Sequence, residues 1–149
     1  MVELRLACVG GLRQPWCRDG AELYAKRLRS YAKLELREVR AGTPAQDSQR
    51  LAKAVEGCRT VLVLDRAGKE LDSGELARTL ATAMDLGRVP IGLVVGGADG
   101  LPAEFAPPGA QRVSFSRLTF PHELFRVLLL EQIYRAFTIL RGEPYHGGH

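Results

Sequence analysis

The chain has 149 residues, of which 46% are hydrophobic and 26% charged, and its formal net charge is +4. This length predicts one domain over residues 1–149, burying roughly 70% of the surface of the unfolded chain. No apolar run approaches the roughly 20 residues that a membrane helix needs, the first residues lack a signal-peptide pattern, and three cysteines in no paired spacing argue against disulfides, so we expect a protein of the reducing cytoplasm.

The first 60 residues alternate between strand and helix patterns. Period-two alternation predicts strands at residues 2–9 and 34–39. Helical spacing of apolar side chains predicts a helix at residues 16–31, and a second helix follows at residues 45–56. The apolar residues assigned to the first helix are Trp16, Leu23, Tyr24, Leu28 and Tyr31.

The remainder of the chain continues this alternation. Nearly continuous apolar runs predict buried parallel strands at residues 60–64 and 91–95, the first followed by an exit loop at residues 65–70. Asp72 or Ser73 caps the next helix. The last elements expected are one helical turn at residues 102–106, a short strand at residues 112–115 and a long apolar helix at residues 123–140. This order predicts an α/β fold with a mostly parallel sheet and helices on both faces.

Positive charge is concentrated at the N-terminal end. Residues 1–60 hold 12 Lys and Arg against 7 Asp and Glu, whereas residues 61–149 hold 9 against 10. Such an excess suggests a polyanionic partner, nucleic acid first, but charge alone predicts function loosely, and a solvated basic surface that binds nothing is the alternative. The basic residues concerned are Arg13, Arg18, Lys26, Arg27, Arg29, Lys33, Arg37 and Arg40.

Two loops follow strands near the C-terminal half of the sheet. The glycine-rich turn at residues 96–100 permits positive φ and close approach to a ligand, but a plain tight turn is an equal interpretation. Residues 116–121 link a strand to a buried helix without a strong turn signal, so their backbone groups must find partners. A ligand with an adenine-like edge would supply them; a loop held by its own apolar side chains is the alternative. In an open α/β sheet, ligands bind where such loops meet.

Polar residues on the last helix and the tail are further candidates. His122 is either an N-terminal cap or a functional residue, and Arg126 needs a partner, either an internal carboxylate or an anionic substrate group. Glu131 and Arg135 are four residues apart and are expected to pair. The tail with Tyr145 and His146 either frays or docks at a site. The helix is apolar nearly all round, which predicts burial on two sides and a two-fold homodimer.

The sequence lacks three common signatures. The cysteines and histidines have no zinc-site spacing, so no metal is expected. No Gly-x-Ser-x-Gly elbow and no Walker motif is present.

Motifs spread over nearly the whole chain resemble the ribosomal large-subunit methyltransferase H family of SPOUT methyltransferases. They are Leu64-Asp65-x-x-Gly68-Lys69, Gly96-Gly97-x-x-Gly100-Leu101, Ser114-Phe115-Ser116-x-Leu118-Thr119-Phe120-Pro121-His122, Arg126-Val127 with Glu131-Gln132 and Tyr134-Arg135-Ala136, Pro144-Tyr145-His146, and, near the N-terminus, Trp16 and Tyr24-x-Lys26-Arg27. The resemblance implies a homodimer with a C-terminal trefoil knot, here about residues 60–149, and an active site across the dimer interface. It implies transfer of a methyl group from S-adenosylmethionine to N3 of a pseudouridine in 23S rRNA of the assembled ribosome.

The resemblance also implies roles for particular residues. Those expected to hold the cofactor are Leu64, Gly97, Ser116, Arg117, Leu118, Thr119, Phe120 and Pro121. Those expected to face the substrate are His122, Arg126, Tyr145 and His146, with the tail supplied by the partner subunit. His146 is the candidate base for the N3 proton, Tyr145 would stack on or bond the target base, and Arg126 would hold a phosphate.

One departure from the family affects the tail. Lys or Arg commonly follows the Tyr-His pair, whereas this chain has Gly147-Gly148-His149. A protonated His149 is one substitute for the missing cation. The departure motivates an alternative function, a non-catalytic RNA-binding module that keeps the fold. The glycine turn alone motivates a third, a nucleotide-binding enzyme of other chemistry.

Overall fold

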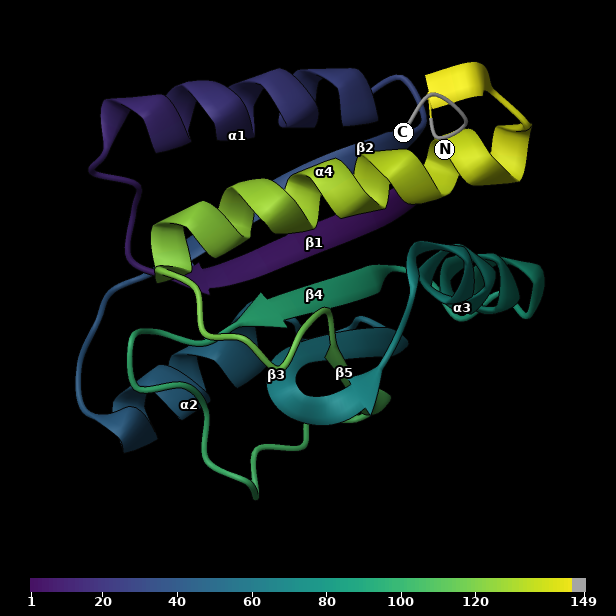
Figure 1. Cartoon of the computed structure of the whole chain (residues 1–149). Coiled ribbons are helices and arrows are strands. Elements are labelled where there is room, and N and C mark those ends of the chain that lie inside the picture. The colour runs from purple at the N-terminus through teal and green to yellow at the C-terminus, as the bar shows by residue number, and fades with distance from the viewer. Residues whose placement is uncertain (146–149) are drawn as a thin grey trace.

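A five-stranded parallel sheet forms the centre of the molecule, with strand order β2-β1-β4-β3-β5 (Figure 1). The computed structural model describes residues 1–145. In chain order the elements are β1 (Val2–Val9), α1 (Pro15–Leu28), β2 (Ala32–Val39), α2 (Pro44–Ala54), β3 (Thr60–Glu70), α3 (Ser73–Asp85), β4 (Ile91–Val95), β5 (Ala110–Ser114) and α4 (His122–Arg141). The predicted α/β class, with a parallel sheet, is confirmed.

Helices cover both faces of this sheet. On one face α1, α3 and α4 pack on strand residues such as Leu6, Leu62 and Leu93. On the other face α2 packs on the alternate strand residues, among them Val61 and Val94. Successive strand side chains point to opposite faces, so the continuous apolar runs of β3 and β4 follow from burial on both sides. Each buried leucine contributes about 2 kcal/mol.

Helix α1 faces the core with only some of the residues predicted: Leu28 is buried, and Tyr24 and Tyr31 pack against the core. Cys17, Ala21 and Leu28 are buried, whereas Trp16 is 59% and Leu23 45% exposed. The side of α1 that faces the core includes the small residues Cys17 and Ala21, which allow α1 to pack closely on α4. The prediction was wrong for Trp16 and Leu23, because it weighted large apolar side chains and these two point away from the core.

Strand β3 is longer than predicted. The expected exit loop at residues 65–70 is part of the strand, and its pairing with β5 shifts between Leu64 and Lys69, so both lie opposite Val113. The intervening residues form a bulge. A Cβ on Gly68 would lie 2.7 Å from the backbone carbon of Arg112, so this crossing requires glycine. After the bulge, β3 pairs with β5 again at Lys69 and Glu70, and α3 begins three residues later.

Local capping explains where the other helices start. Asp72 accepts a hydrogen bond from the backbone N–H of Glu75 at 2.7 Å and forms a capping box at the start of α3, as predicted. Thr43 and Gln46 form the same motif at α2. Residues 102–106 form a turn closed by Phe105 N–H and the Pro102 carbonyl, at 3.0 Å, and not the helical turn predicted. None of the helices within residues 1–145 has the length and apolarity to cross a membrane.

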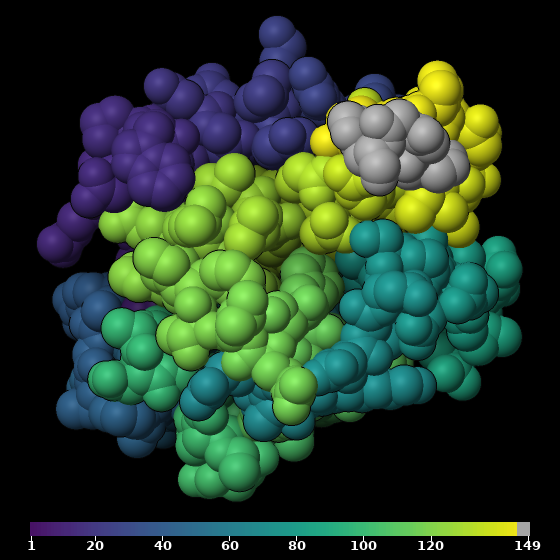
Figure 2. All heavy atoms as spheres, viewed as in Figure 1, coloured from purple at the N-terminus to yellow at the C-terminus, as the bar shows by residue number. Residues whose placement is uncertain are grey.

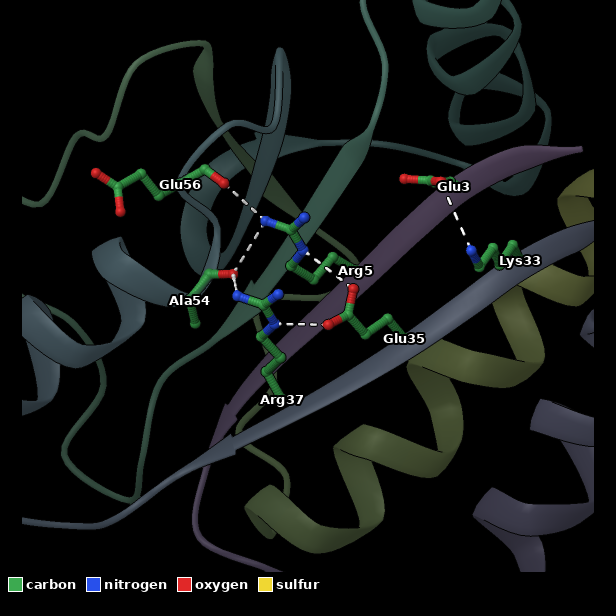
Figure 3. A network of polar contacts seen from close by, with 7 residues as sticks. All are labelled: Glu3, Arg5, Lys33, Glu35, Arg37, Ala54 and Glu56. Carbon is green, nitrogen blue, oxygen red and sulfur yellow. Dashed lines mark hydrogen bonds and ion pairs between the residues drawn. The ribbon is translucent and has the colours of Figure 1, made fainter.

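Two arginines on β1 and β2 hold the C-terminal end of α2 (Figure 3). Arg5 and Arg37 both donate to the Ala54 carbonyl, at 3.3 and 3.2 Å, and Arg5 also donates to the Glu56 carbonyl at 2.8 Å. Glu35 lies between the two guanidinium groups and pairs with Arg37 at 2.8 Å. Cations at a helix C-terminus complement its unsatisfied carbonyls. Arg37, assigned to the basic surface from sequence, therefore has a structural role.

Candidate functional site

A pocket of about 320 Å³ lies where the first half of β3 ends, at its bulge, beside the C-terminal end of β4 and the start of α4. Three segments that are far apart in sequence form its walls: residues 64–66, residues 95–101, and residues 115–116 with 118–120; His122 and Phe125 of α4 complete it. Parallel strands end at one edge of the sheet, which brings these loops together. The volume is near the lower end of the usual range for ligand pockets.

Most residues predicted to hold the cofactor line this pocket. Those that do are Leu64, Gly97, Ser116, Leu118, Thr119 and Phe120. Two do not: Arg117 points away and pairs with Glu70 at 3.0 Å, and Pro121 is the N-cap of α4. The structure brings the predicted set together; its role in cofactor binding stays a prediction.

The glycine turn is held by its own backbone. Gly100 N–H donates to the Gly97 carbonyl at 2.9 Å, and Gly100 has φ +72°, a conformation that favours glycine. The tight turn that sequence left open is therefore present. The same turn also forms one wall of the pocket, so the two interpretations are compatible.

The loop at residues 116–121 is organised by serine side chains and leaves some backbone donors open. Ser116 accepts from Leu118 N–H through its hydroxyl at 3.0 Å, and its carbonyl accepts from the Ser114 hydroxyl at 3.0 Å. Within residues 1–145, the backbone N–H groups of Thr119 and Phe120 make no hydrogen bond. These donors are available to a ligand at the pocket wall.

Aromatic rings supply an apolar wall. Phe125 of α4 lies 5.8 Å from Phe115 and 6.3 Å from Phe120 between ring centroids. Sequence analysis did not assign Phe115 and Phe125 to the site. The signal for Phe125 was its position one turn after the start of α4, directly beside the predicted loop.

Arg112 on β5 is a positioning residue that sequence analysis missed. It pairs with Asp65 at the end of the first half of β3 and donates to the carbonyls of Pro102 and Phe105 at 2.6 and 3.0 Å. One guanidinium thereby connects two pocket-forming segments, because Asp65 and Leu101 both line the pocket. Asp65 and Arg112 are 47 residues apart, and no sequence spacing could have revealed the pair.

His122 lies at the pocket, whereas Arg126 does not. His122 is the first residue of α4, and the cap is Pro121 with no side-chain hydrogen bond, so the interpretation of His122 as a cap was wrong. Arg126 is buried, with 4% of its side chain exposed; it pairs with Glu38 and donates to the Gly10 carbonyl at 2.8 Å. Of the two partners considered for Arg126, the internal carboxylate is the one present. Its phosphate-binding role stays a prediction.

Tyr145 packs beside the middle of α4, away from the pocket. Its hydroxyl donates to Glu131 at 2.7 Å, its ring meets Tyr134 edge-on at 4.8 Å, and Arg135 lies 5.0 Å over its face. Glu131 also forms the predicted pair with Arg135, at 2.8 Å. Burial, followed by the hydrogen bond to Glu131, raises the pKa of Tyr145, so the hydroxyl stays protonated at neutral pH and can donate but not act as a base. His146 lies outside the described residues.

The cysteines take no part in this pocket. Cys8, Cys17 and Cys58 are free, buried thiols. Burial raises the pKa of Cys8 to about 11, although Arg126 beside it opposes the shift, so the thiol is neutral at physiological pH. A neutral buried thiol is unreactive.

Comparisons with known proteins agree with the motifs. A family model described as a predicted SPOUT methyltransferase matches residues 2–146. A protein of Geobacter sp. (strain M21) is 40% identical over 152 residues, and one of Methylococcus capsulatus is 41% identical over 155 residues; each alignment covers 97% of this chain and 99% of the relative. A protein of Desulfitobacterium hafniense is 36% identical over 160 residues, covering 98% of this chain and 99% of the relative. All three relatives are named ribosomal RNA large subunit methyltransferase H.

Proposed function

The chain belongs to the SPOUT methyltransferases, within the ribosomal RNA large subunit methyltransferase H family, and from this premise we propose that it methylates N3 of a pseudouridine in 23S rRNA on the assembled ribosome. The methyl donor in this proposal is S-adenosylmethionine. The observation that carries it is the pocket between β3, β4 and α4, which gathers six of the eight predicted cofactor residues.

The pocket residues suit S-adenosylmethionine. The open backbone N–H groups of Thr119 and Phe120 can bond the polar edge of an adenine ring, while Leu64 and the phenylalanine rings offer apolar contact to its faces. Bound there, the cofactor would supply an electrophilic methyl group. The task of the chain is then to align an acceptor nitrogen and to remove its proton.

The proton on N3 requires an acceptor that works near neutral pH. His146 is the candidate, because histidine titrates in that range. Tyr145 precedes it, and its raised pKa fits a role in bonding or stacking on the base, with its proton retained. His122, at the pocket edge, is positioned to contact the incoming nucleotide.

A homodimer is needed for these residues to meet. About 14 Å of helix separates His122 from Glu131, where Tyr145 is bound, so Tyr145 does not line the pocket of its own chain. A two-fold pair would bring the tail of one chain to the pocket of the other. In Figure 2 the yellow-green surface of α4 lies between α1 and α3, and Leu124, Val127 and Leu128 on α4 are only half-buried, which supports a partner there. A trefoil knot over about residues 60–149 of one domain belongs to the same proposal.

The substrate assignment fits the charge of the chain. Exposed cations on α1 and its flanks, such as Arg18, Arg29 and Lys33, would give sequence-independent affinity for RNA. Specificity would come from ribosome shape and an extruded base. The ribosome as substrate places the protein in the cytoplasm.

A second candidate is an RNA-binding module without turnover. The replacement of the usual basic residue after Tyr145-His146 by Gly147-Gly148-His149 favours it. Both candidates predict ribosome binding, and only the first predicts methyl transfer.

The test is transfer of labelled methyl groups from S-adenosylmethionine to purified ribosomes that lack the modification, with the labelled base identified by mass spectrometry. We expect one N3-methylated pseudouridine per 23S rRNA. His146→Ala should lower turnover at saturating ribosomes by about 10²–10⁴-fold if the histidine is the base. Lys53→Ala, at an exposed position of α2 on the other face of the sheet, is the control. Ribosome binding without any methyl transfer would support the second candidate.

A further inference from the structure

A second cavity, of about 690 Å³, lies between α3 and the β3–β5 edge of the sheet. Much of its wall comes from the N-terminal ends of β3 and β5, at residues 59–60 and 109–111, and Lys69 joins it from beyond the bulge of β3. The methyltransferase pocket lies at residues 64–66 of β3 and at the C-terminal end of β4, and the two cavities share no lining residue. On β3, four strand steps of about 3.3 Å separate Thr60 in the groove from Leu64 in the pocket, roughly 13 Å of sheet. The cavity is therefore distinct from the pocket assigned above. We call it the α3 groove.

Four cations line the α3 groove, namely Arg59, Lys69, Arg78 and Arg88. All four are exposed, and none forms an ion pair with any residue in the part of the chain that the structure describes. Arg59 makes one long side-chain hydrogen bond, 3.4 Å, to the Gly87 carbonyl. Like charges gathered around one cavity repel each other, and an anion relieves that repulsion.

The single carboxylate in the groove is already engaged. Glu75 bonds the backbone N–H of Asp72 as part of the α3 capping box. The lining thus has a net charge of about +3 by residue type, although residues 61–149, which hold most of it, have one more acidic than basic residue. The groove is positively charged because the fold brings together cations from separate segments, and not because one segment is rich in them.

The polar lining suits phosphate more than a nucleobase. No aromatic side chain lines the groove, so no stacking surface for a base is present among the residues described. Thr82 lies one helical turn after Arg78 on α3, and Gln111 faces them from the edge strand β5. Arginine, lysine, hydroxyl and amide groups are the usual partners of phosphate and sugar oxygens.

We propose that the α3 groove binds the phosphate backbone of rRNA, as a second contact remote from the methylated base. This inference rests on the proposed rRNA substrate. The groove would fix the orientation of the enzyme on the ribosome without reading sequence, because backbone contacts position a protein and carry no base information.

The test is the salt dependence of binding to purified ribosomes and to isolated 23S rRNA, at fixed magnesium. The triple variant Lys69→Gln/Arg78→Gln/Arg88→Gln should reduce the slope of log K against log salt by about 2, at about 0.7 per single-strand contact. Arg78→Gln alone should reduce it by about 0.7. Lys53→Gln, which removes an exposed charge from α2 on the other face of the sheet, is the matched control and should leave the slope unchanged.

Three further readouts separate this inference from the function it rests on. Binding of S-adenosylmethionine and the thermal midpoint should be unchanged in all variants. If the wild type methylates rRNA and the triple variant keeps its slope, the groove inference fails and the function stands. A loss with ribosomes but not with isolated rRNA would assign the groove to a ribosomal protein and overturn the RNA contact. No rRNA binding by the wild type would overturn the function itself.

Discussion

Two sets of arginines in this chain have opposite surroundings. Arg126 and Arg112 are tied to carboxylates and carbonyls of distant segments, whereas Arg78 and Arg88 face a cavity and pair with no carboxylate among residues 1–145. The first set stabilises the fold and the pocket wall, and the second is available to an external anion. An arginine therefore shows its role through its partners and not through its place in a basic stretch.

The largest expected difference between the two sets is in stability. Arg126→Met leaves the Gly10 carbonyl without its side-chain donor and Glu38 without its cation. Breaking a buried pair from one side costs about 3 kcal/mol, at the low end of the usual range because Glu38 is 40% exposed. Urea unfolding measures this. Arg78→Met, the control on α3, should change stability by less than about 0.5 kcal/mol. Equal losses of stability in Arg126→Met and Arg78→Met would contradict this difference between the two sets of arginines.

A smaller effect is expected at the pocket wall. Arg112→Met removes the link between Asp65 and the turn at Pro102, so the pocket-forming segments lose their relative positions. The displaced wall should weaken binding of S-adenosylmethionine about tenfold, a loss of about 1.4 kcal/mol in binding free energy. Titration calorimetry checks this, with Arg88→Met as control. Unchanged affinity in Arg112→Met would show that the wall is positioned without this arginine.

The smallest effect concerns the carboxylate of Glu123 and depends on pH. Hydrogen bonds from the backbone N–H groups of Gln14, at 3.0 Å, and Arg13, at 2.7 Å, hold the pKa of Glu123 below its usual range. The folded pKa is depressed, so this stabilisation is present above the ordinary pKa of about 4.3 and is lost as pH falls through the lower folded value. Glu123→Gln should therefore reduce stability at pH 7 and flatten its fall below about pH 4. Thermal midpoints between pH 3 and 7 measure this, with Glu22→Gln on α1 as control. Parallel pH profiles for Glu123→Gln and the wild type would contradict it.

The sequence predicted local features well, because they depend on near neighbours. The Asp72–Glu75 cap, the buried β4 run and the Glu131–Arg135 pair all lie within a few residues of each other. The pocket followed from one further rule, that loops after parallel strands share an edge.

Contacts across the sheet could not be predicted in this way. Glu38 and Arg126 are 88 residues apart, and the cations of the α3 groove come from β3, α3 and the segments before β3 and β4. The exposed Trp16 shows the same limit, since helical spacing alone does not reveal which side of α1 faces α4. Patterns in a single sequence do not show which distant residues contact each other.

The proposed function depends on binding of S-adenosylmethionine in the pocket between β3, β4 and α4. Its most direct test is titration calorimetry of the purified protein with S-adenosylmethionine, with NAD and ATP as controls. Saturable binding of S-adenosylmethionine alone, lost when Thr119→Pro removes a backbone N–H at the pocket wall, is the predicted result. Saturable binding of NAD or ATP in its place would contradict the claim.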